Sequence, residues 1–97
     1  MTSENRKYEL AYLLSPNVPE EEVLAWAGKL ARLIEDAGGI IRRQETPAKR
    51  RLAFPVKKER NAYLGWTTLT AAPEAIAGLE KKLKTTENLL RHIVVAE

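Results

Sequence analysis

The chain has 97 residues, of which 44% are hydrophobic and 30% are charged, a balance typical of one folded domain. It contains no cysteine and a single histidine, which excludes disulfides, thiolate metal sites and histidine clusters. Its net charge is +3, and it shows neither the apolar core of a signal sequence nor a run long enough to cross a membrane. We therefore expect one cytoplasmic domain over residues 1–97, ordered over about residues 6–96, with no metal, cofactor or membrane partner.

The first predicted elements are a strand and a helix. Apolar residues alternate with polar or small ones over residues 6–14, which favours a strand with one buried face. The acidic run 20–22 suits the positive end of a helix, and apolar residues then recur at helical spacing. Gly38 and Gly39 offer a left-handed stop, so the helix is expected to end at about Asp36.

An edge strand is predicted next. It begins at Ile40, is interrupted near Pro47 and resumes over residues 51–56. Pro47 and Pro55 lack an amide donor, which an edge strand tolerates better than a central one. The apolar residues expected on one face of this strand, where they would fix it in place, are Leu52, Phe54 and Val56.

The second half of the chain completes a sheet with two helices. A polar turn over residues 57–61 leads into a strand over 62–70, and Pro73 begins a second helix. Residues 89–95 form the last strand. The order predicts an α+β fold, a ferredoxin-like split β-α-β-β-α-β plan in which two helices cover one face of a four-stranded antiparallel sheet.

The uncovered face of that sheet is expected to bind a partner. Alternation places Leu64 and Trp66 on one side of the third strand, and Ile93 and Val95 beside Arg91 on one side of the last strand. These four apolar side chains would form an exposed patch, which usually indicates a protein contact. His92, on the opposite side of the last strand, is expected to be a packing residue.

The basic residues are concentrated in one segment. Residues 42–60 hold eight of the 16 Lys and Arg side chains and two carboxylates, a local charge of +6, so the remainder of the chain sums to −3. Local charge of this kind steers encounters with polyanions and predicts a nucleic-acid surface. Protection of a sheet edge by charged side chains is the structural alternative.

Several short motifs resemble one protein family. YEL at residues 8–10, LSPN at 14–17, GG at 38–39, RRLAFPV at 50–56 and the last strand are similar, in this order, to the bacterial small ribosomal subunit protein six, over about residues 7–95. The resemblance implies a structural, non-enzymatic role in the small subunit, with binding to the central domain of its ribosomal RNA together with ribosomal protein eighteen. Gly65 and Thr67 depart from the larger residues common in the family, which predicts thinner packing near the partner surface.

Candidate site residues follow from the charge, the alternation and the resemblance together. The residues expected to contact RNA phosphates are Lys7, Arg42, Lys49, Arg50, Arg51, Lys57, Lys58, Arg60 and Arg91. The residues expected to bind the protein partner are Leu64, Trp66, Ile93 and Val95. Base stacking on Tyr8, Tyr63 or Trp66 is a less favoured reading, because the aromatic pattern of an RNA recognition motif is absent.

Two other functions use the same fold class. A regulatory domain that binds a small ligand would need a compact pocket and would show weak salt sensitivity. A small acylphosphatase-like hydrolase would need an arginine in the loop after the first strand. Residues 15–22 (SPNVPEEE) contain no arginine and three acids that would repel an anionic substrate, so we expect neither catalysis nor a small-molecule substrate.

Overall fold

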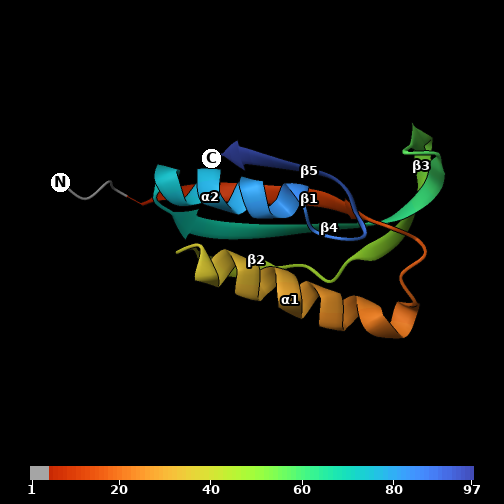
Figure 1. The fold of residues 1–97 in the computed structure, drawn as a ribbon, viewed down its shortest axis with the longest axis horizontal. Coiled ribbons are helices and arrows are strands. Elements are labelled where there is room, and N and C mark those ends of the chain that lie inside the picture. The colour runs from red at the N-terminus through yellow and green to blue at the C-terminus, as the bar shows by residue number, and fades with distance from the viewer. Residues whose placement is uncertain (1–4) are drawn as a thin grey trace.

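The computed structural model describes residues 5–97 and confirms the predicted split arrangement. Figure 1 shows two helices on one side of an antiparallel sheet, with a hairpin that projects from one end. In chain order the elements are β1 (Arg6–Leu14), a short 3₁₀ turn η1 (Glu20–Glu22), α1 (Val23–Asp36), β2 (Ile40–Gln44), β3 (Ala48–Val56), β4 (Glu59–Ala71), α2 (Pro73–Lys84) and β5 (Leu89–Ala96).

The sheet has five strands, so the prediction of four is wrong. The order is β2-β4-β1-β5, and β3 also pairs with β4. The predicted single edge strand is in fact two strands that follow one another along the same edge: β2 pairs with residues 67–70 of β4, and β3 pairs with residue 59 and residues 61–64. Pro47 lies buried at the break, where its missing amide donor costs no ladder hydrogen bond.

The core lies between the sheet and the helices. β1 and β4 bury most of their inward residues, among them Leu10 and Leu69, which are both 0% exposed. α1 contributes Leu30 and Ile34 to the same cluster, and α2 contributes Leu79 and Leu83. The helical spacing and the strand alternation therefore converge on one apolar layer, as the sequence predicts.

The helix ends also follow the predicted signals. Gly38 has φ 101°, a conformation that favours glycine, and the amide of Gly39 donates to the carbonyl of Ile34 at 2.8 Å. Pro73 occupies the first turn of α2, where a missing amide proton costs no helical bond. These ends fix where the chain leaves each helix and enters the next strand.

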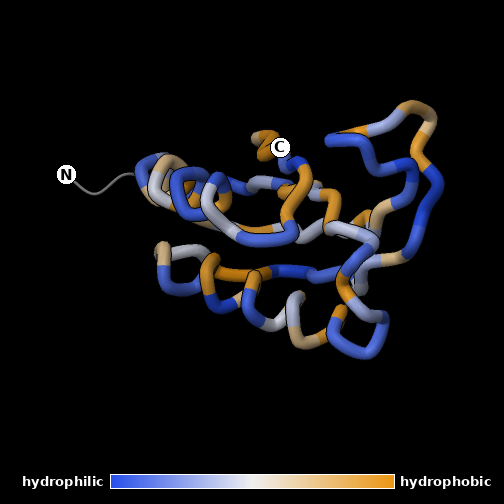
Figure 2. Tube along the Cα trace, turned by 45° about the vertical axis from the view of Figure 1, so that its right-hand side comes forward, coloured by the Kyte–Doolittle hydropathy of each residue, from blue (hydrophilic) through white to orange (hydrophobic). Residues whose placement is uncertain are grey.

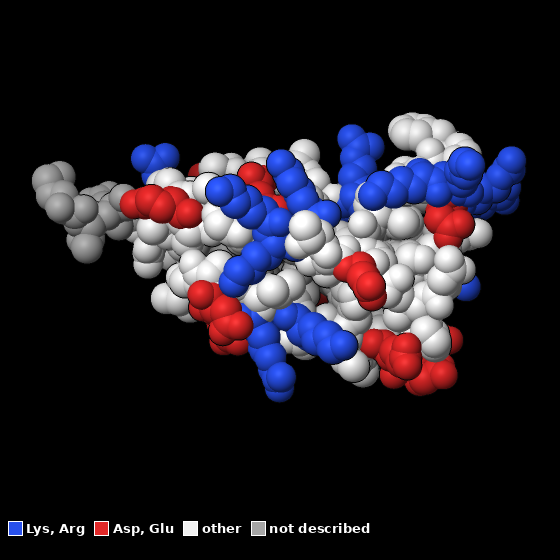
Figure 3. All heavy atoms as spheres, viewed as in Figure 1, with Lys and Arg blue, Asp and Glu red and all other residues white. Residues whose placement is uncertain are grey.

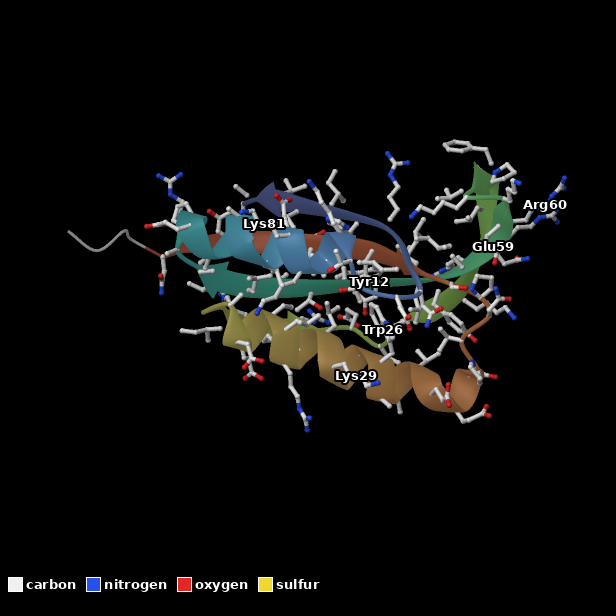
Figure 4. The ribbon with its side chains drawn as sticks, viewed as in Figure 1. Tyr12, Trp26, Lys29, Glu59, Arg60 and Lys81 are labelled. Carbon is white, nitrogen blue, oxygen red and sulfur yellow. The ribbon has the colours of Figure 1, made fainter. Side chains whose placement is uncertain are left out.

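Gly65 and Thr67 lie on the helix-covered face, so the prediction that they thin the packing near the partner surface is wrong. Gly65 pairs with Tyr12, and a Cβ at Gly65 would lie 2.5 Å from Cζ and from the hydroxyl oxygen of that ring. The Tyr12 ring therefore fills the space that a larger residue would take. Its centroid is 5.2 Å from that of Trp26 in α1, and Figure 4 shows the two side chains between the sheet and the helix.

The hairpin formed by β3 and the start of β4 projects away from this core. Figure 2 shows an apolar stretch on the projecting hairpin, flanked by hydrophilic segments and away from both helices. Phe54 is 68% exposed, so the expectation that it fixes the strand together with Leu52 and Val56 is wrong. Leu52 and Val56 are only half-buried, because no second layer covers this part of the chain.

Candidate nucleic-acid and partner interfaces

Six of the nine candidate RNA-binding residues lie together on the projecting hairpin. All six side chains are exposed, and none of them forms a salt bridge within residues 5–97. Figure 3 shows Lys and Arg gathered over this hairpin, with a cluster of Asp and Glu below them near the beginning of α1. We call this set the basic hairpin; its members are Lys49, Arg50, Arg51, Lys57, Lys58 and Arg60.

The register places basic side chains on both sides of the hairpin. Lys49 pairs with Tyr63 and Arg50 pairs with Ala62, so the two neighbouring side chains point to opposite sides of the ladder. Arg51 pairs with Asn61 and returns to the side of Lys49. The basic hairpin can therefore neutralise phosphates on either side.

A tight turn carries the two lysines at the tip. Val56 pairs with Glu59, which leaves Lys57 and Lys58 as a two-residue loop. Their φ angles are 49° and 70°, the left-handed region that both central residues of a type I′ turn require. Asn-Gly is the usual sequence in such a turn, and a lysine is disfavoured there by its Cβ. The tip thus presents two charges at a cost in backbone strain.

The other three candidate RNA-binding residues are not part of the basic hairpin. Lys7 pairs with Thr70 at the opposite end of the sheet, and Arg42 lies where β2 shifts register against β4. Arg91 pairs with Leu13 on the uncovered face of the sheet, among the partner-binding candidates. The neighbouring Arg43 is paired with a carboxylate, since its Nε lies 2.8 Å from Oε1 of Glu45.

The uncovered sheet face is an apolar surface that three strands build in rows. Ala11 of β1 pairs with Trp66 of β4 and with Ile93 of β5. Leu13 pairs in the same way with Leu64 and Arg91, and Glu9 pairs with Thr68 and Val95. Trp66, Ile93 and Val95 are 37%, 58% and 52% exposed. We call these nine residues the open face.

The open face is hollowed near its middle. A shallow depression of about 280 Å³ is lined by side chains from all three strands, including Leu13, Leu64 and Ile93, with Arg91 beside them. The sequence prediction found the contributions of β4 and β5 but missed Leu13 and Ala11 of β1. The available signal was Leu13, which breaks the alternation by placing an apolar residue on the outward side of β1.

Three other kinds of feature would indicate other functions of the described part of the chain: a metal site, a membrane helix and a pocket for a small ligand. No three His, Cys, Asp or Glu side chains within the described part of the chain are placed to hold a metal ion. None of the described helices is long and apolar enough to cross a membrane. A hollow of about 390 Å³ between α1 and residues 86–88 is lined by Trp26, Leu30 and Leu33, among others, and is a place where the small-ligand alternative could bind its ligand.

Comparisons with known proteins point to one family. A family model described as "Ribosomal protein S6" matches residues 7–96. The chain is 34% identical over 92 residues to small ribosomal subunit protein bS6 of Clostridium beijerinckii, a match covering 95% of this chain and 97% of the relative. It is also 34% identical over 90 residues to the protein of the same name from Thermosynechococcus vestitus, covering 93% and 79%.

Solved structures share the fold. The crystal structure of 30S ribosomal protein S6 from Thermotoga maritima aligns with a TM-score of 0.90 at 24% identity, covering 97% of this chain and 89% of that one. An uncharacterized protein of the same organism aligns with a TM-score of 0.57 at 19% identity, covering 96% and 98%. At these identities the likeness supports the split α+β arrangement of Figure 1 and nothing finer.

Proposed function

We propose that this chain, which belongs to the ribosomal protein S6 family, binds the central domain of small-subunit ribosomal RNA together with ribosomal protein eighteen. As a member of that family it is a structural, non-enzymatic component of the small ribosomal subunit in the cytoplasm. In the proposal the basic hairpin contacts the RNA and the open face contacts the protein partner. One observation carries it: β4 runs through both surfaces, from Glu59 and Arg60 at the hairpin to Leu64 and Trp66 on the open face.

The chemistry of the basic hairpin suits phosphate groups. Arginine presents a planar fork of donors that matches two phosphate oxygens. Arg50, Arg51 and Arg60 are exposed and form no salt bridge with a carboxylate within residues 5–97. Lys57 and Lys58 add two point charges at the tip of the hairpin. Contacts of this kind set affinity and orientation but read no base sequence.

The open face suits a protein. Trp66 and Ile93 lie in the same row across β1 and leave apolar surface in water, a cost that a partner would remove. Tryptophan with nearby arginine is typical of the residues that carry most of the binding energy in protein interfaces. Arg91, in the next row, can pair with a carboxylate of the partner or reach a phosphate at its margin.

Binding of the two partners is expected to be cooperative. A hairpin with six basic side chains makes few phosphate contacts, and the ordering cost of association consumes much of their contribution. A partner seated on the open face would extend the positive surface along β4. Each partner then increases the affinity of the other by the same factor.

A salt titration of RNA binding tests the proposal. The affinity for a central-domain ribosomal RNA fragment is measured with and without ribosomal protein eighteen, for the natural chain and for Arg50→Ala/Arg51→Ala. The matched control is Lys81→Ala/Lys82→Ala, which removes the same charge from α2, far from the hairpin (Figure 4). We expect the hairpin variant to lower the slope of log affinity against log salt by about one to two and the helix variant to leave it nearly unchanged.

One further double variant tests the open face. Trp66→Ala/Ile93→Ala is expected to weaken binding to ribosomal protein eighteen and to abolish its effect on RNA affinity, while the slope for RNA alone stays the same. Equal RNA affinity with and without the partner would contradict the cooperative part of the proposal. If the hairpin variant also behaved like the helix control, the charges would serve as edge protection and the small-ligand alternative would be favoured.

A further inference from the structure

Phe54 is an exposed aromatic ring among positive charges, and neither the core nor the open face uses it. It is 68% exposed, more than any other large hydrophobic residue described by the structure. A ring of this size left in water has a free-energy cost that a bound partner would remove. It is also the single phenylalanine of the chain, which gives it a unique spectroscopic signature.

Phe54 lies in a large bulge of β3. Arg51 pairs with Asn61, and the next pair in the ladder is Val56 with Glu59. Four residues of β3, from Leu52 to Pro55, therefore lie opposite Arg60 alone. A bulge of this kind bends the strand and redirects its side chains, which places Phe54 outward although the alternation predicts a face shared with Leu52.

The bulge and the facing strand form a shallow hollow. It measures about 200 Å³, and its lining comprises residues 51–55 and Arg60. Arg51 and Arg60 therefore line the same hollow as Phe54. In Figure 4 the Arg60 side chain extends outward from the hairpin, away from the body of the protein.

We propose that Phe54 stacks against an unpaired base of the bound RNA, while Arg51 and Arg60 hold the phosphates on either side of it. An aromatic ring in a basic groove is the arrangement by which proteins bind single-stranded nucleic acid with little sequence preference. A base in a duplex has both faces stacked, so the site selects unpaired nucleotides. This inference rests on the proposed RNA contact of the basic hairpin and adds a residue and a class of ligand to it.

Charge favours RNA over a protein as the occupant. The hairpin over residues 51–60 holds Arg51, Lys57, Lys58 and Arg60 against one carboxylate at Glu59. This local excess of positive charge attracts a polyanion and is satisfied by successive phosphates, whereas a peptide would need several acidic residues at the same spacing. The protein occupant is one outcome of the test below.

Fluorine NMR of the single phenylalanine tests the contact without a mutation. The full chain is prepared with 4-fluorophenylalanine, which gives one resonance because Phe54 is the only site. A short adenine-rich RNA strand is added in one titration, and heparin, a polyanion without bases, in another. We expect an upfield ring-current shift with the RNA strand and a much smaller change with heparin. Equal shifts, or no shift at RNA saturation, would overturn the proposal.

A variant gives the matching affinity measurement. Phe54→Leu keeps an apolar side chain but removes the aromatic face, and the exposure of the residue makes loss of folding a minor concern. We expect its affinity for the single strand to fall by about 5- to 30-fold with an unchanged salt slope, and its affinity for a blunt duplex to stay the same. Phe54→Trp should retain the affinity for the single strand.

The outcomes separate this inference from the proposed function. If Arg50→Ala/Arg51→Ala lowers the salt slope while Phe54→Leu binds RNA like the natural chain, the stacking is wrong and the phosphate surface stands. If Phe54→Leu weakens binding to ribosomal protein eighteen and leaves RNA binding intact, the ring contacts the protein instead, which also overturns the proposal.

Discussion

The basic hairpin and the covered half of the sheet share strand β4, but different features determine which of their side chains are buried. Leu69 of β4 faces the helices and is fully buried, and its position could be predicted from alternation alone. Phe54 of β3 has the same place in an alternating pattern and is 68% exposed. Alternation identifies the buried side of a strand only where a second layer covers that side. Where none exists, register and bulges determine the direction of each side chain.

The presence or absence of a covering helix layer divides the molecule into a region that stabilises the fold and a region that is free to bind. The covered part of the sheet packs against α1 and α2, and the hairpin has neither helix beside it (Figure 1). Residues of the hairpin can therefore be charged, strained or exposed at little cost to the fold. The open face is intermediate between the core and the hairpin: its side chains are exposed, but its strands are fixed by the core on their opposite side.

The largest expected effect contrasts one substitution in the two regions. Leu69→Ala removes a side chain with no exposure and should lower the free energy of unfolding by about 2–5 kcal/mol. Leu52→Ala removes the same atoms from the half-buried hairpin and should cost less than about 1 kcal/mol. Urea unfolding of both variants gives the two values. Equal losses would mean that the hairpin packs as tightly as the core and would refute the contrast.

The next effect concerns a polar group inside the covered region. Burial raises the pKa of Tyr12 from 10.0 to about 12, and its hydroxyl has no hydrogen-bond partner among residues 5–97. The unfolded chain therefore loses this proton at a lower pH than the folded one. The contribution of Tyr12 to stability is fully present below pH 10 and falls as the pH rises toward about 12, by no more than about 2–3 kcal/mol.

The matched variant for this prediction is Tyr12→Phe, which removes the ionising group and keeps the ring beside Trp26. Unfolding free energies measured from pH 9 upward should decline more steeply for the natural chain than for this variant. Parallel declines would show that the hydroxyl titrates alike in the folded and unfolded states.

The sequence predicts the covered region well and the site only in part. The bounds of β1 and the beginning of α2 at Pro73 are as predicted, because burial on one side reinforces each local signal. The open face is also largely predicted, since it is the reverse of the buried side. The sequence shows the basic segment as a stretch of chain, but the division of the edge into β2 and β3 is set by the pairing of both strands with β4.

The same reason explains which site residues the sequence could not group. Lys7 and Arg91 are as basic as Arg60, yet one lies at the far end of the sheet and the other on the open face. The number of charges in a stretch of sequence does not show which strands lie side by side, and so it does not show which basic residues come together in the fold. Alternation places Phe54 on one face with Leu52 and Val56, because the three-residue shift between Arg51 and Val56 is a property of strand pairing and not of local sequence.

The smallest expected effect is at the tip of the hairpin, where one double substitution should raise stability and weaken RNA binding. Lys57→Asn/Lys58→Gly replaces two residues at positive φ by the pair that a type I′ turn prefers. Relief of the strain, less the added chain entropy of glycine, should increase the free energy of unfolding by about 1 kcal/mol. The same change removes two charges, so the salt slope for RNA binding should fall by up to about two.

A charge-only variant separates the two consequences. Lys57→Gln/Lys58→Gln loses the same charges and keeps the strained backbone, so its salt slope should fall equally with no gain in stability. A gain in stability for Asn-Gly with unchanged RNA binding would mean that the lysines contact no phosphate, and the tip would then lack a reason to remain strained. If the salt slope of RNA binding falls equally in both variants and only the Asn-Gly variant gains stability, the natural turn keeps two lysines for binding a polyanion at a cost in folding stability. The hairpin would then differ from the core even at a single turn, because binding rather than packing would determine its residues.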